Sequence, residues 1–76
     1  SKATSKLKKE ADALEASIIK AEAVLAEHHD ELLRASNVGD NSKVIELSQQ
    51  VAAEENAVEE AFERLEEVQN NIDDIV

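Results

Sequence analysis

The chain of 76 residues contains no cysteine, proline, tryptophan, tyrosine or methionine, and it has one glycine and one phenylalanine. Because cysteine is absent, the chain has no disulfide framework and no thiolate metal site, and nothing indicates an oxidising compartment. The scarcity of aromatic residues argues against a platform on which exposed bases could stack. Charged residues make up 34% of the sequence, which is typical of long helices and coiled coils.

Long apolar runs are also missing, so we expect no membrane span, no signal peptide and a cytoplasmic location. A chain of this length forms one small unit at most and buries a modest fraction of its surface. We therefore expect no cavity that encloses a small-molecule substrate.

Apolar residues recur in both halves of the chain at steps that alternate between three and four. This average of 3.5 residues is the period of a coiled coil, so each half is predicted to carry one apolar seam. The first seam consists of Leu7, Ala11, Leu14, Ile18, Ala21, Leu25, His28, Leu32 and Ala35. The second consists of Val44, Leu47, Val51, Glu54, Val58, Ala61, Leu65, Val68, Ile72 and Ile75.

The two seams match when the chain folds back between Gly39 and Asp40. In that register Ala35 faces Val44, and each earlier residue of the first seam faces a later one of the second. The sequence therefore predicts an all-α fold, a two-helix antiparallel coiled-coil hairpin over residues 5–76. We expect a helix over 5–36, a turn over 37–41 and a helix over 42–74, with residues 1–4 as a linker or the edge of an expressed segment.

The ends of the predicted helices carry residues that commonly cap helices. Thr4 or Ser5 is expected to cap the first helix, and Asn37 and Gly39 tolerate the left-handed backbone of a helix end. The turn is thus expected to involve Asn37, Gly39 and Asp40. Candidate caps for the second helix are Asp40, Asn41 and Ser42.

Two seam positions are polar, His28 and Glu54. A charge on a coiled-coil seam costs stability but can specify register or partner. In the predicted register the two side chains lie one layer apart. Either they interact diagonally, or the Glu54 carboxylate turns out to solvent.

Catalytic and metal sites find little support in the sequence. The run His28-His29-Asp30-Glu31 lacks a second histidine four residues away, and adjacent helical residues point about 100° apart, so joint chelation is not expected. The carboxylates of the second half would lie on a convex helix without a pocket. We therefore expect a chain that is not an enzyme by itself and that holds no cofactor and no metal.

Apolar residues outside the seams fall on one flank of the predicted hairpin. The opposite flank is polar and carries Lys20, Glu27, Arg34, Glu46, Glu60 and Glu67. The apolar flank either extends a narrow core, drives formation of a homodimer, or docks another domain or partner. Its candidate docking residues are Ile19, Leu33, Ile45 and Phe62.

The net charge of −10 is unevenly distributed. Residues 1–36 hold six Lys and Arg against seven Asp and Glu, whereas residues 37–76 hold two against eleven. The acidic second helix argues against wrapping in nucleic acid, but the basic end leaves room for a local phosphate contact. The candidate contact residues all precede the first acid, Glu10, and are Lys2, Lys6, Lys8 and Lys9.

Segments in both halves of the chain resemble a known family, and the resemblance covers nearly the whole chain. Residues Ala3–Glu10, followed by Leu14-Glu15, resemble the K-L-S-Y-K-x-x-R-E-L-E opening segment of the C-terminal domain of ABC-F ATPases, the Uup-like group. Lys43–Leu47 and Ala53–Glu67 are similar to that domain's K-V-x-E-L and L-E-x-x-L-E-x-x-[YF]-E-R-W-E-E-L-E. Leu65 stands where the family has Trp, and Ser5 stands where it has Tyr.

The resemblance implies an accessory arm of a cytoplasmic, non-transporting ATPase that has two ATP-binding cassettes and acts on ribosomes. ATP and Mg would belong to the cassettes, which this chain does not contain. Such arms contact DNA, ribosomal RNA or other ribosomal components, and Lys6, Lys8 and Lys9 would supply the basic contact.

Two further interpretations stay open at this point. One is a purely structural module that dimerises into a four-helix bundle through the apolar flank. The other is the tRNA-binding arm of a synthetase of the seryl type, although such an arm would be more basic along its length than this chain is.

Overall fold

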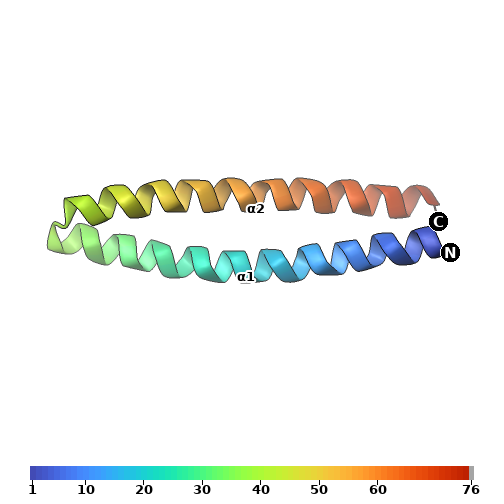
Figure 1. Cartoon of the computed structure of the whole chain (residues 1–76), viewed down its shortest axis with the longest axis horizontal. Helices are drawn as coiled ribbons and strands as arrows, with labels where there is room; N and C mark the ends of the chain where they lie inside the picture. Colours follow the sequence, from blue (N-terminus) through green and yellow to red (C-terminus); the bar gives the residue numbers. More distant parts are fainter. Residues whose placement is uncertain (76) are drawn as a thin grey trace.

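The computed structural model describes residues 1–75 and consists of two long helices. Helix α1 spans Lys2–Val38 and helix α2 spans Asn41–Ile75. They lie side by side and antiparallel, with both chain ends at the same end of the molecule (Figure 1). The molecule measures 56 × 14 × 12 Å, and its radius of gyration is 17.1 Å, against roughly 11 Å for a compact domain of this length. The predicted hairpin is confirmed; Val76, also predicted within it, lies outside the described residues.

The core of the hairpin is the predicted seam. Every apolar residue that is buried in the described chain belongs to one of the two apolar series, and Val68 is completely buried. The small residue predicted to face Val68, Ala11, is also buried, which agrees with close packing of large against small. At the open end the seam weakens, because Ile75 is exposed. The other buried apolar residues are Ile18, Ala35, Leu47 and Val51.

The first helix begins earlier than predicted. Ser1 is the cap: its side-chain oxygen accepts a hydrogen bond from the backbone N–H of Thr4 at 3.3 Å. The expected linker at residues 1–4 and the expected caps Thr4 and Ser5 are therefore wrong. Thr4 instead continues the seam three residues before Leu7 and is buried, with its hydroxyl 3.0 Å from that of Ser1.

The turn between the helices is shorter than the predicted 37–41, because Asn37 is still helical and Asn41 begins α2. Gly39 adopts the left-handed conformation, with φ 74° and ψ 26°. Its N–H donates to the carbonyl of Ser36, and the N–H of Asp40 donates to that of Ala35, which is the Schellman closure of a helix.

Of the three candidate caps for α2, the structure selects Asp40. Its Oδ1 accepts a hydrogen bond from the backbone N–H of Lys43 at 3.1 Å, and its carbonyl accepts one from Val44. This is the usual bonding of a helix N-cap. Between Val38 and Asn41, the chain thus reverses through Gly39 and Asp40 alone.

Replacing Gly39 with Ala should therefore destabilise the hairpin through the backbone alone. A Cβ atom at this position would meet nothing within 4 Å, but φ is positive. We expect a loss of about 1 kcal/mol in the free energy of unfolding, measured by urea titration, and a smaller loss for Gly39→Asn. Val38→Ala, one residue earlier on the exposed helix end, is the control. Equal stability of Gly39→Ala and wild type would show that the left-handed closure is not needed.

Candidate functional site

The four candidate lysines occupy the first turns of α1, at the open end of the hairpin. All four side chains are exposed, and no carboxylate oxygen of the described residues lies within 4.0 Å of their ammonium groups. The helix N-terminus adds a partial positive charge at the same end. The structure thus brings together Lys2, Lys6, Lys8 and Lys9 on one exposed helix end.

The acid nearest to these lysines in sequence, Glu10, is held by the other helix. Arg64 donates from Nε to Glu10 Oε2 at 2.8 Å and from Nη2 to Glu10 Oε1 at 3.1 Å. A third contact joins Arg64 Nη1 to Glu67 Oε1 at 3.2 Å. These paired hydrogen bonds have the fork geometry that favours arginine over lysine for binding a carboxylate.

The hydrogen bonds with Arg64 lower the pKa of the Glu10 carboxyl and raise that of the guanidinium. The pair therefore contributes to stability above the ordinary glutamate pKa and is lost as the pH falls through the lowered value. Both side chains are partly exposed, so solvent screens the pair. Sequence reasoning missed this contact, although positions 10 and 64 each directly precede a seam residue, which places them on the same flank.

On the seam, His28 and Glu54 form the diagonal contact that was one of the two expectations. The Nδ1–H of His28 donates to Oε1 of Glu54 at 2.7 Å, and both side chains are largely buried. This hydrogen bond is the main reason that the pKa of His28 is raised above 6.5, against the opposing effect of desolvation. Nearby Glu31 and Glu27 raise it further.

The neighbouring histidine lies on the apolar flank rather than on the seam. Its Nε2 is 3.4 Å from Oε1 of Glu55, and both side chains are about half exposed. His28 and His29 therefore each pair with a different glutamate of α2. Among residues 1–75, no group of three or more His, Cys, Asp or Glu side chains is arranged to hold a metal ion.

The four apolar flank residues do not form one continuous patch. Ile19 and Phe62 line a shared hollow of about 280 Å³. Leu33 lines a separate hollow nearer the turn, together with His29. His29 lies between Ile19 and Leu33 along α1, and its partner Glu55 lies between the other two flank residues along α2, so a polar pair interrupts the flank.

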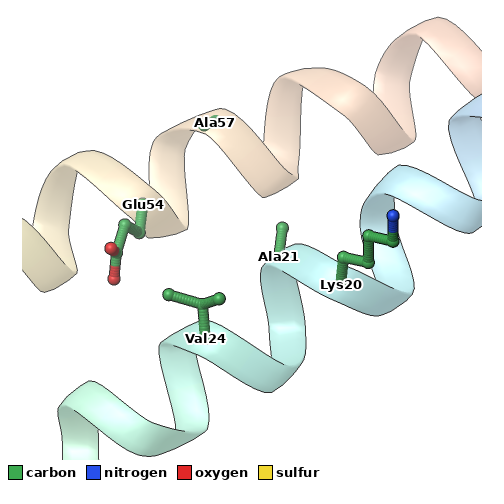
Figure 2. A pocket seen from close by; sticks show the side chains of 5 residues that line it. All are labelled: Lys20, Ala21, Val24, Glu54 and Ala57. Carbon is green, nitrogen blue, oxygen red and sulfur yellow. The ribbon is translucent and has the colours of Figure 1, made fainter.

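The opposite flank, predicted to be polar, also holds an apolar hollow. Figure 2 shows Ala21 and Val24 pointing from α1 towards α2, while Glu54 extends from α2 towards α1. Together with Lys20 and Ala57 they line an open volume of about 340 Å³. Small side chains at positions 21 and 57 leave this space, which the seam pattern alone does not reveal.

At the tip of the hairpin, the polar groups of the turn mostly form the hydrogen bonds that end α1 and begin α2. Gly39 ends α1 and Asp40 caps α2, so the polar groups of Asp40 already bond within the turn. The side chain presented at the tip is Val38, which is strongly exposed. The sequence analysis had not singled out this residue.

The fold thus defines an antiparallel coiled-coil arm with a basic end and an acidic second helix. The chain belongs to the ABC transporter C-terminal domain family, whose sequence model matches residues 2–70. The resemblance to the C-terminal domain of ABC-F and Uup-like proteins is confirmed by this match. The chain is therefore an accessory domain of ABC proteins and not their catalytic cassette.

No curated protein and no solved structure matches the chain. Within residues 1–75, neither helix is long and apolar enough to cross a membrane.

Proposed function

We propose that the chain is the accessory arm of an ABC-F-like ATPase of the cytoplasm, and that it contacts the phosphate backbone of DNA or ribosomal RNA. Family membership supports the first part of the proposal. In such a protein ATP and Mg would bind to the cassettes, and the arm would have no catalytic role. The proposed contact residues are Lys2, Lys6, Lys8 and Lys9.

The observation that supports the phosphate contact is that the lysines of the basic end form no ion pair within the described residues. Glu10 lies four residues after Lys6, the spacing at which a helical ion pair commonly forms. Both oxygens of Glu10 instead accept hydrogen bonds from Arg64, and no ion pair within 4.0 Å joins Glu10 to Lys6, so the ammonium group of Lys6 is open to an external anion. Lys8 and Lys9 are likewise without a carboxylate in the described chain.

The mechanism would be geometric. A stiff rod 56 Å long can hold its basic end against phosphates while its flank or its turn reaches a second surface. Binding through a few lysines would be weak, sensitive to salt and without sequence preference, since phosphate contacts carry no base information.

A triple substitution tests the phosphate contact. Lys6→Glu/Lys8→Glu/Lys9→Glu should weaken binding to labelled duplex DNA and structured RNA by about tenfold or more in fluorescence anisotropy at low salt. The matched control changes three cations elsewhere on the arm by the same total charge, Lys20→Glu/Arg34→Glu/Lys43→Glu. If both triple variants lose binding equally, net charge and not the basic end governs the interaction. If the wild-type chain binds neither probe at low salt, the proposal fails.

A second candidate function is a structural arm that docks a protein or dimerises through the apolar flank. It is favoured by the exposure of Ile19, Leu33 and Ile45, each of which leaves more than half of its surface in solvent. Sedimentation equilibrium distinguishes docking of another protein from dimerisation, because a chain that is a monomer at all concentrations does not dimerise.

A further inference from the structure

Two hollows meet at Phe62, midway along the acidic helix. The first lies between the helices and is floored by Ile18, Ile19, Phe62 and Leu65. The second, of about 470 Å³, shares Phe62 and Leu65 and continues along α2. We call the residues that line both hollows the Phe62 groove. Its two exposed apolar side chains are Ile19, which is 69% exposed, and Phe62, which is 47% exposed.

The rim of the Phe62 groove is acidic on both sides of Phe62. All of its rim carboxylates are exposed, and none lies within 4.0 Å of a cationic group of the described residues. Like charges so close together repel one another and are not neutralised by the arm itself. The rim residues are Glu15 and Glu22 on α1, and Glu59, Glu63 and Glu66 on α2.

The second helix cannot supply the missing positive charge. Between residues 41 and 75 its cations are Lys43, beside the turn, and Arg64. The guanidinium of Arg64 is held by Glu10 and Glu67, which lie on the opposite flank. The cations of α1 also make no ion pair with the rim within 4.0 Å, so the rim is free to pair with positive charge on another molecule.

We propose that the Phe62 groove docks a basic amphipathic helix of a partner protein. The apolar side chains of that helix would enter the two hollows, and its Lys or Arg side chains would pair with the rim. Helix-in-groove recognition uses anchors at i, i+3 or i+4 and i+7, a spacing that suits two adjoining hollows on one flank. Because the rim is acidic, the partner helix is expected to be basic.

A second copy of the chain does not fit this surface. Each copy carries a net charge of −10, and a dimer through the groove would place one acidic rim against another. A small molecule is also disfavoured, because both hollows are shallow and open to solvent, whereas a ligand pocket buries most of the surface of its ligand.

This inference gives the docking function proposed above a defined site and a partner of stated charge. It does not depend on the four lysines, since none of them lines the groove. Loss of nucleic-acid binding and loss of helix docking can therefore be observed separately.

The test uses a labelled helical peptide made of leucine and lysine, with its leucines on one face. We expect measurable binding by anisotropy, and about tenfold weaker binding to Phe62→Ala. Leu33→Ala, on the same flank but outside the groove, should bind within about twofold of wild type. Circular dichroism should show an intact hairpin for Phe62→Ala, because Phe62 is already 47% exposed and lies outside the seam.

A second pair of variants tests the rim without altering the apolar floor. Glu15→Gln/Glu22→Gln should weaken binding about threefold or more, whereas Glu46→Gln/Glu60→Gln, on the opposite flank, should not. A scrambled peptide of the same composition should bind less tightly than the amphipathic one. Equal losses for the two Gln pairs, or unchanged binding to Phe62→Ala, would overturn the proposal. A dimer of the free chain that Phe62→Ala abolishes would identify a second copy as the occupant and would overturn it as well.

Discussion

Leu47→Ala is expected to lower the free energy of unfolding by about 2–5 kcal/mol, the range observed when a buried leucine is truncated to alanine. Leu47 is 4% exposed and lies in the seam near the turn, where it closes the first layers of the hairpin. A two-helix arm buries little surface in total, so a loss of this size removes much of its stability. The thermal midpoint, followed by circular dichroism, should fall by roughly 10 °C or more.

The control for this prediction is the same substitution at Leu33. Leu33 is 62% exposed, so Leu33→Ala should change the free energy of unfolding by less than about 0.5 kcal/mol. If the two variants were destabilised equally, Leu33 would be buried in solution, for example in a dimer through the flank. That result would contradict the monomeric hairpin as the stable unit.

The contrast between Leu47 and Leu33 shows why the fold could be predicted from the sequence. Both are leucines in helices, but only Leu47 lies on the series of three-residue and four-residue steps. This period determines which face of each helix is buried, and one glycine followed by a capping aspartate determines where the chain reverses. The spacing of the apolar residues and the position of the turn together allow one register between the two helices.

The helix ends were predicted less well, because capping residues are frequent in polar sequences and local signals compete. Thr4 resembles a cap by residue type, yet its place one step before Leu7 on the seam draws it into the core. The cap then moves to Ser1. Thr4 is thus buried on the seam, against the local preference of threonine for a helix start.

The candidate sites could be predicted only in part. The diagonal contact of His28 with Glu54 was one of the two arrangements expected from the register, since both residues lie on the seam. The contact of Arg64 with Glu10 did not, because long side chains on a flank have several acids within reach and the choice depends on the geometry of the pair. Exposed lysines do not identify one ligand, because they can bind the phosphates of any nucleic acid.

Raising the pH should destabilise the hairpin through His28. Its pKa is raised above 6.5 in the folded chain, mainly by the hydrogen bond to Glu54, so the folded state holds a proton that the unfolded state releases. The stabilising effect is complete below pH 6.5, declines as the pH rises through the raised pKa, and is absent above it. Urea titrations between about pH 5.5 and 8.5 should show this decline.

The adjacent histidine provides a matched control. His29→Gln should keep the decline with pH, because His29 and its partner Glu55 are about half exposed and solvent screens them. His28→Gln should remove it. A decline that persists in His28→Gln, or disappears in His29→Gln, would assign the titration to another group.

Replacing His28 and Glu54 together should raise the stability of the hairpin, whereas replacing either one alone should lower it. Glu54→Leu alone would leave the imidazole of His28 without its partner in a largely buried place, and His28→Leu alone would strand the carboxylate. His28→Leu/Glu54→Leu removes both polar groups, and well-packed apolar residues often stabilise a protein relative to a buried ion pair. We expect the thermal midpoint of the double variant to rise by roughly 5 °C or more and to become independent of pH in this range.

The same double variant tests what the pair does for specificity. An uninterrupted apolar seam no longer penalises other registers or oligomers, as a single polar seam residue does in coiled coils. We therefore expect the double variant to form higher oligomers in sedimentation experiments at concentrations where the wild type does not. A double variant that is more stable yet keeps the same oligomeric state would show that the turn and the alternation of large and small residues suffice for register. His28 and Glu54 would then contribute the response to pH alone.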